Sequence, residues 1–139
     1  MYHKIIIVGY LGTDPEMRYT PTGVPVTHFR VATNRRFTDS EGNQREITTW
    51  FRITAWRKLA EQCNEYLSKG RLVLIEGELS PDESGNPRVW VGSDGTVRAS
   101  YDVTALRVRF LGKAPAQEEV SEISYEDIPE PEEEEEIPF

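Results

Sequence analysis

The amino-acid sequence predicts an all-β domain with one helix, followed by a disordered acidic tail. Three observations carry this prediction. Several segments are short, rich in β-branched residues and bounded by Gly, Pro and Asn, as strands are. One segment instead repeats its apolar residues at helical spacing. The composition then changes abruptly after residue 113. A length of 139 residues leaves room for one domain of ordinary size.

Five segments have the pattern of main strands. They are residues 4–11, 26–37, 46–56, 71–79 and 101–111. Residues 16–20, between two turn signals, are a candidate short extension, and residues 38–45 are predicted to form a polar hairpin loop. Residues 80–100 contain two turn clusters, Asp82–Pro87 and Gly92–Gly95, which predict a long hairpin excursion.

The predicted helix covers residues 58–69, where Leu59, Cys63, Tyr66 and Leu67 recur at helical spacing. Gly70 is the expected C-cap. Cys63 is the single cysteine, and its apolar position predicts a buried structural thiol. Three strands, one helix and two strands is the element order of the OB-fold, a five-stranded barrel. The fold prediction is therefore an OB-fold barrel with long hairpin excursions.

Charge divides the chain into two parts. Residues 1–113 contain 16 basic and 13 acidic residues, a net charge of +3, whereas residues 114–139 contain 11 acidic residues and no basic one. Low hydrophobicity with high net charge does not offset the entropy lost on ordering a chain. We therefore expect a folded domain over residues 1–113 and a disordered acidic tail over residues 114–139.

The third strand carries a stripe of aromatic and basic side chains. Side chains alternate between the faces of a strand, so Phe51 and Ile53 point to one face, and Trp50, Arg52 and Trp56 to the other. The first set suits a barrel interior. Two indoles on the outer face indicate a binding partner. Single-stranded nucleic acid fits, because its bases stack on aromatic rings and its phosphates pair with Arg and Lys.

Other basic and aromatic residues extend this candidate site. They are Arg35, Arg36 and Phe37 at the end of the second strand, Arg57 and Lys58 after the third, and Arg88, Trp90 and Arg98 in the long hairpin. Alternative interpretations stay open at each position. A Trp can belong to the core or to a subunit interface, and a lone Arg or Lys is more often a solvated surface charge.

The sequence resembles the bacterial single-stranded DNA-binding proteins. The matching stretches are KIIIVGYLGTDPEMRYTPTGVPVTHFRVAT at 4–33, WFRITAWRKLAEQCNEYLSKGRLVLIEGEL at 50–79, VRFLGK at 108–113 and the terminal IPF after an acidic run. The resemblance implies an OB-fold that binds single-stranded DNA without sequence preference, as a homotetramer, in replication, recombination and repair. It implies stacking on Phe37, Trp50, Trp56 and Trp90, and basic contacts from Lys4, Lys58 and Lys69.

Some features depart from the family pattern. The hairpin from Ser80 to Ser100 is longer than usual, which makes the role of Trp90 an open question. Phe51 occupies a position where the family has His, a residue that contributes to the subunit interface in some relatives. The acidic end is rich in Glu rather than Asp, and the linker before it is short.

The tail suggests two hypotheses. As a tethered polyanion it would compete with DNA for the basic face, since a short tether keeps its effective concentration on the order of millimolar. Its tip, Ile137, Pro138 and Phe139, would enter pockets of replication, recombination and repair proteins through an aromatic ring and the terminal carboxylate. The alternative is a simple solubility device, although an apolar tip does not aid solubility.

The sequence contains no phosphate-binding Gly-rich loop, no paired cysteines and only two histidines, so we expect no enzyme, no cofactor and no metal. Carboxylates such as Glu76, Glu78, Asp82 and Glu83 could hold a nuclease metal, but solvated hairpin charges are commoner. The N-terminal apolar run is too short for a signal peptide or a membrane span, and a single cysteine fits a reducing cytoplasm. We therefore expect a cytoplasmic protein, associated with the nucleoid through its DNA binding. Two further alternatives are an OB-fold adaptor of the primosome type and an RNA-binding OB module.

Overall fold

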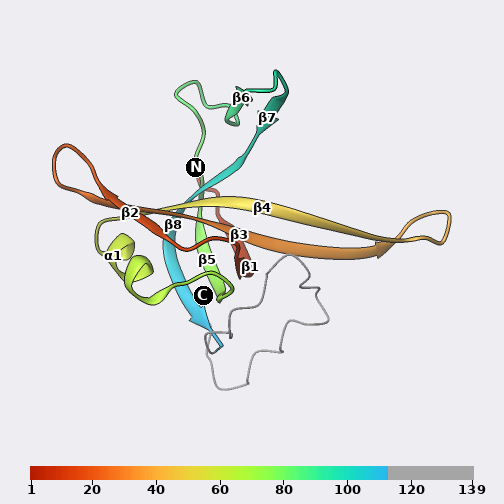
Figure 1. Cartoon of the computed structure of the whole chain (residues 1–139), viewed down its shortest axis with the longest axis horizontal. Helices are drawn as coiled ribbons and strands as arrows, with labels where there is room; N and C mark the ends of the chain where they lie inside the picture. Colours follow the sequence, from red (N-terminus) through yellow and green to blue (C-terminus); the bar gives the residue numbers. More distant parts are fainter. Residues whose placement is uncertain (113–139) are drawn as a thin grey trace.

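A computed structural model of the chain describes residues 1–112 (Figure 1). The described part contains eight strands and one helix. They are β1 (Ile5–Leu11), β2 (Glu16–Tyr19), β3 (Pro25–Thr38), β4 (Gln44–Trp56), α1 (Arg57–Tyr66), β5 (Leu72–Leu79), β6 (Val89–Val91), β7 (Val97–Ala99) and β8 (Tyr101–Leu111). The predicted disordered tail, residues 114–139, lies outside the described residues, and so does Lys113 at the predicted domain boundary.

The main sheet closes into a barrel. Its strand order is β1-β5-β8-β4-β3-β2, and β1 also pairs with β3, which joins the two sides of the sheet. Five strands (β1, β3, β4, β5 and β8) therefore form a closed barrel, with β2 added to the side of β3. Strands β4 and β8 run parallel between Phe51–Thr54 and Tyr101–Thr104. With α1 between the third and fourth barrel strands, the predicted OB-fold is confirmed.

The barrel interior is apolar. Leu11, Val31, Ile53, Val73, Ile75 and Val103 are almost completely buried there, and each comes from an alternating position of its strand. The inward face predicted for residues 46–56 is confirmed at Ile53 and Ala55. Ile47 has the same parity but is 53% exposed, because the outer half of the β3–β4 ribbon extends beyond the barrel (Figure 1).

Closing so small a barrel requires two backbones to approach each other closely. A Cβ added at Gly9 would lie 2.3 Å from the carbonyl oxygen of Ala32, on the β3 segment that pairs with the end of β1. An alanine at this position would therefore force β1 and β3 apart. The glycine is required at the point where the sheet closes on itself.

Helix α1 covers one end of the barrel and is shorter than predicted. Ala60 and Cys63 face the core, and the Thr27 hydroxyl of β3 donates to the Ala60 carbonyl at 2.7 Å. The helix ends at Tyr66 instead of residue 69, because Leu67 is already extended and its side chain is buried. Gly70, with φ 88°, is therefore not the C-cap. Its N–H donates to the Leu11 carbonyl in the turn before β5.

Two arms project from the barrel (Figure 1). One is the long β3–β4 ribbon, and the other is the separate two-stranded sheet β6–β7, which forms the predicted excursion between β5 and β8. Asp39 and Asp82 organise similar turns. Each accepts backbone N–H bonds through Oδ1 from residues two and four positions later, and each turn has a glycine with positive φ, Gly42 or Gly85.

The predicted burial of the single cysteine is confirmed. Cys63 lies in the core cluster, and burial raises the pKa of its thiol to about 12. A thiol with so high a pKa carries almost no thiolate near neutral pH, so its role is packing. Separately, none of the helices within residues 1–112 has the length and apolar character needed to cross a membrane.

Candidate nucleic-acid interface

A groove lies between β4 and the β6–β7 arm. From Gln44 to Trp50, β4 pairs only with β3 within the described chain, because its pairing with β8 begins at Phe51. The arm rises beside this edge, and the space between them is an open groove of about 790 Å³. Its lining residues are Arg30, Ile47, Thr48, Thr49, Trp50, Arg52, Arg88, Trp90, Arg98, Ala99, Ser100 and Tyr101. This lining contains four arginines and three aromatic residues, without a carboxylate.

Trp50 forms part of the groove wall, as its predicted outward orientation requires. The side chain is half-buried, because its ring lies over Gly12 on one side. A Cβ at Gly12 would come within 2.2 Å of Cζ3 of the indole. The guanidinium of Arg30 sits 4.9 Å from the ring centroid, a cation–π distance. The indole is thus held in place by the protein.

Trp90 lines the same groove, a position that the sequence left open because the register of its hairpin was uncertain. It lies on β6 opposite Arg98 of β7 and is 39% exposed. The Arg88 guanidinium lies 5.3 Å from its ring centroid. Both arginines are oriented by carboxylates, Arg98 by Asp94 at 3.2 Å and Arg88 by Asp102 at 3.8 Å. The hairpin therefore presents an aromatic ring flanked by positioned cations.

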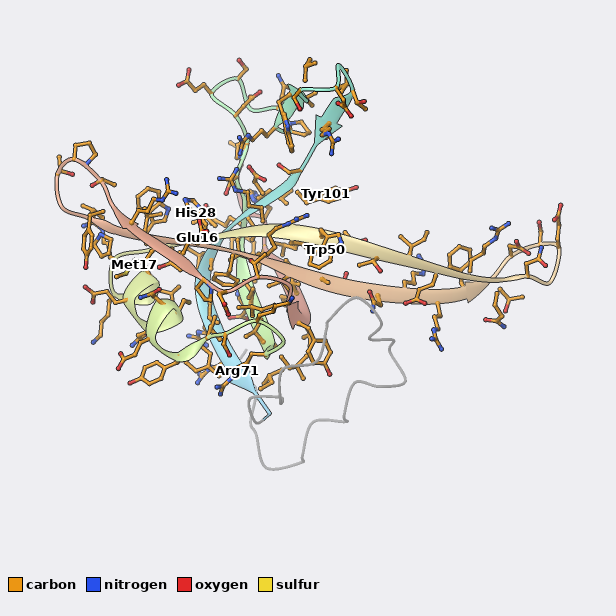
Figure 2. The ribbon with its side chains drawn as sticks, viewed as in Figure 1. Glu16, Met17, His28, Trp50, Arg71 and Tyr101 are labelled. Atoms are coloured by element: carbon orange, nitrogen blue, oxygen red, sulfur yellow. The ribbon has the colours of Figure 1, made fainter. Side chains whose placement is uncertain are left out.

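Arg52 lies directly opposite Arg30 in the antiparallel β3–β4 register. Both residues also line a second, smaller groove of about 410 Å³ beside β2. The other lining residues of this second groove are Thr13, Asp14, Glu16, Arg18, His28 and Phe29. Figure 2 shows Glu16 and His28 beside β2, with Trp50 further along the ribbon and Tyr101 near the base of the arm. The two grooves meet at the arginine pair.

Trp56, Arg57 and Lys58 lie at the opposite end of β4, outside both grooves. Trp56 is 44% exposed and has the same strand parity as Trp50. The two tryptophans are six positions apart, which corresponds to roughly 20 Å along an extended strand. Arg57 begins α1 with a φ of 58°, and its side chain and that of Lys58 are exposed. These residues form a separate cationic and aromatic end of the surface.

The Arg35–Phe37 cluster is not a simple continuation of the Trp50 stripe. In the register with β4, Arg36 pairs with Glu46 and shares the parity of Trp50. Arg35 and Phe37 pair with Ile47 and Arg45 and so have the opposite parity. The Arg35 guanidinium lies 5.6 Å from the Phe37 ring centroid, which makes these two a separate pair on the β3–β4 arm. Arg35 and Phe37 therefore lie on the opposite face of the β3–β4 ribbon from Trp50, and their contact with nucleic acid stays a prediction.

Lys4 and Lys69 also lie away from the two grooves. The Lys4 ammonium is 3.7 Å from the buried Glu76 carboxylate, which is also 3.8 Å from Arg107. Lys69 follows α1, and its backbone N–H donates to Asp14 Oδ1 at 2.8 Å. Neither lysine lines either groove. Ile137, Pro138 and Phe139, the predicted partner-binding tip, lie outside the described residues.

Residues 1–112 hold no group of three or more His, Cys, Asp or Glu side chains placed to bind a metal ion. The candidate carboxylates named from sequence do not converge. Glu76 is engaged by two cations, and Asp82 accepts the backbone N–H groups of Ser84 and Asn86. Among the described residues, every charged side chain that lines the larger groove is an arginine.

Sequence reasoning missed two groove residues, Arg30 and Tyr101. Tyr101 begins β8, is 62% exposed and packs against Phe51 with ring centroids 5.8 Å apart. Arg30 was detectable in principle. It occupies an outward position between the inward Phe29 and Val31, so the alternation of β3 alone exposes it. Its placement opposite Arg52 depends on the pairing register, which a single strand does not show.

The model of the single-strand binding protein family matches residues 2–111. A single-stranded DNA-binding protein of Neisseria meningitidis is 43% identical over 110 residues, covering 79% of this chain and 60% of the relative. One from Thermotoga maritima is 43% identical over 130 residues, covering 93% and 87%. The chain thus spans only about 60% of the length of the Neisseria relative.

The fold comparison agrees. The crystal structure of a small single-stranded DNA-binding protein from Streptomyces coelicolor superposes with a TM-score of 0.63 at 29% identity, covering 78% of this chain and 93% of that one. The matched family is defined by binding, in line with the prediction that the chain is not an enzyme. The resemblance seen in the sequence motifs is confirmed. From its motifs, its barrel and these matches, the chain belongs to the single-strand binding protein family.

Proposed function

We propose that this protein binds and protects single-stranded DNA without sequence preference. The observation that carries the proposal is the groove in which Trp50 and Trp90 stand among four arginines. Unpaired bases stack on indoles at roughly 1–3 kcal/mol each, largely regardless of their identity. Arginines pair with the phosphates that link these bases. Such contacts hold the strand without reading its sequence.

Duplex DNA suits this groove poorly. The indoles offer flat surfaces, and in a duplex the base faces are already stacked on one another. The arginines alone would give salt-dependent attraction to any polyanion. Stacking therefore supplies the preference for a single strand, and the arginines add affinity and speed of association.

The test is a titration of intrinsic tryptophan fluorescence with oligo-dT at several salt concentrations. Oligo-dT should quench the tryptophan fluorescence of the wild-type protein, and the affinity for oligo-dT should fall as the salt concentration rises. W50A and W90A should each weaken binding by roughly 5- to 150-fold, which corresponds to one lost stacked base. Arg109→Gln is the matched control, because this exposed β8 residue lines neither groove.

Two outcomes would contradict the proposal. Equal affinity of wild type and W50A for oligo-dT would favour an adaptor whose main partner is a protein. Tighter binding of oligo-U than of oligo-dT would favour an RNA-binding module. Unfolding curves of each variant establish that the barrel is intact, so that lost binding reports on the groove.

We further propose that the protein acts as a homotetramer in DNA replication, recombination and repair. One OB barrel covers roughly 4–16 nucleotides, so several barrels would protect a longer strand and let it wrap. The family resemblance supports the same assembly. Light scattering of the free protein should give four times the chain mass of 15.9 kDa, and a monomer or stable dimer would refute the tetramer.

The tail supplies a second proposed function, recruitment of replication, recombination and repair proteins. The support is chemical: 11 acidic residues of segment 114–139 precede an apolar tip made of Ile137, Pro138 and Phe139. Acidic residues speed encounter with basic partners, and the aromatic ring of Phe139 can enter an apolar pocket. Wild-type protein should recover such proteins from an extract, and a variant lacking Phe139 should not. Equal recovery would leave the tail as a solubility device.

A further inference from the structure

The pair Arg30 and Arg52 is unusual within a sheet. They are direct cross-strand partners in the antiparallel β3–β4 ladder. Such partners have Cβ atoms roughly 4.5–5.5 Å apart, and like charges in this position repel. A sheet selected only for stability would place a carboxylate or a neutral side chain opposite an arginine.

No carboxylate compensates the repulsion. Within residues 1–112, neither guanidinium forms an ion pair. Asp102 is the closest candidate, since it neighbours Arg52 in the parallel β4–β8 register. Its carboxylate is already engaged, however, by the Ser100 hydroxyl at 2.5 Å and by Arg88 at 3.8 Å.

The other arginines of the main groove differ in this respect. Arg88 and Arg98 each have an acidic partner that orients them and offsets their charge. Arg30 is instead held by its position over the Trp50 ring. Arg30 and Arg52, which have no acidic partner within residues 1–112, therefore place two positive charges on neighbouring strands next to a proposed stacking surface.

The pair lies where the two grooves meet. Within the described residues, only Arg30 and Arg52 line both grooves. A strand that occupies the larger groove and continues into the smaller one must cross them. Beyond the pair, the smaller groove contains Asp14, Glu16 and Arg18, two acidic side chains against one basic, so the junction is more positive than the space beyond it. Asp14 accepts the Lys69 N–H, and Glu16 stands opposite His28 in the β2–β3 register.

We propose that Arg30 and Arg52 form a phosphate clamp, in which both guanidiniums grip one backbone phosphate of the single strand where the two grooves meet. Guanidinium and phosphate match in geometry, and Arg favours such paired hydrogen bonds. The phosphate also removes the repulsion between the two side chains. This inference rests on the proposed single-stranded DNA binding and assigns Arg30 a function that the sequence motifs do not.

The salt dependence of affinity tests the clamp. Each phosphate neutralised on a single strand contributes about 0.7 to the slope of log affinity against log salt. Binding of (dT)8, short enough for one barrel, is measured for wild type, R30Q, R52Q and the double variant. Because a shared phosphate keeps one arginine in either single variant, each single slope should stay near the wild-type value. The double variant should lose about 0.7.

Two results would overturn the clamp. If each single variant loses about 0.7 and the double variant about 1.4, the arginines contact different phosphates. If the double variant keeps the wild-type slope, they contact no phosphate. R109Q serves as the charge-matched control and should keep both affinity and slope. Failure of wild-type protein to bind (dT)8 at all would instead refute the proposed function, so the two failures are distinguishable.

Discussion

The indole of Trp50 lies against the backbone of Gly12, with no space for a side chain between them. An added Cβ would approach Cζ3 to 2.2 Å and Cη2 to 2.5 Å. The β1–β2 connection thus acts as a flat support for the ring. The Arg30 guanidinium lies over the same indole, 4.9 Å from its centroid. Gly12 and Arg30 together determine where Trp50 stands.

Gly12→Ala should therefore displace Trp50. Overpacking of this kind costs about 1–3 kcal/mol of unfolding free energy. Affinity for oligo-dT should fall as well, because the indole leaves its stacking position. Urea unfolding and fluorescence titration measure the two effects. In a Trp50→Leu background, Gly12→Ala should lower the unfolding free energy only slightly. An equally large loss in that background would show that the strain does not come from the Trp50 ring.

The β6–β7 arm should be dispensable for folding but not for DNA binding. Its strands form a sheet of their own, separate from the barrel. Replacing residues 82–99 with a short Gly-Ser turn should leave cooperative unfolding intact. Affinity for oligo-dT should fall at least as much as in W90A, and the salt slope should decrease because Arg88 and Arg98 are removed. A variant with unchanged affinity would exclude the arm from the interface.

The tip of the β3–β4 arm should loosen in acid. The hydrogen bond from the Asn43 backbone N–H, and to a smaller extent the one from the Arg45 side chain, lower the pKa of Asp39. A lowered folded-state pKa means that the stabilisation is complete above the unfolded pKa of about 3.9 and is lost as pH falls through the folded value. The Asn43 amide signal in NMR spectra should therefore titrate below pH 3.9. Asp39→Asn keeps an acceptor but cannot titrate there, so its Asn43 signal should stay constant.

Thr27→Val should destabilise the domain without weakening DNA binding. The buried Thr27 hydroxyl donates to the Ala60 carbonyl at 2.7 Å and ties α1 to the barrel. Loss of one partner of a buried hydrogen bond costs about 1–3 kcal/mol. Urea denaturation measures this loss, and Thr22→Val at the exposed β2–β3 turn is the near-neutral control. Reduced affinity for oligo-dT in the folded variant would show that α1 influences the groove.

Local patterns sufficed for most of the fold. Alternation in residues 46–56 correctly assigned Ile53 and Ala55 to the interior and Trp50 to the outer face. The helix boundary was wrong, because Leu67 fits a helical repeat but is extended and buried. The prediction that Gly70 caps the helix was wrong for the same reason. Helix periodicity records which side chains are apolar, and tertiary packing decides where the helix stops.

The candidate site was only partly predictable. The outward orientation of Trp50, Arg52 and Trp56 could be predicted from one strand, because side-chain alternation does not depend on which strand lies beside it. Phe37 was predicted to lie near Trp50 because it ends the neighbouring strand, although it has the parity of Phe29 and Val31 and lies on the opposite face from Trp50. The position of Trp90 in the groove depends on how the β6–β7 arm lies beside β4, and no local sequence pattern shows this.

Sequence by itself determined the strand and helix identities, the charge division between residues 1–113 and 114–139, and the outward stripe of β4. Each follows from the spacing of residues along one segment. Tertiary structure decided which residues meet. The β3–β4 register places Arg30 opposite Arg52, and the β6–β7 arm brings Trp90 to the same groove as Trp50. These relationships depend on pairing between segments distant in sequence, so the physical basis of the site is the closed barrel and its arms.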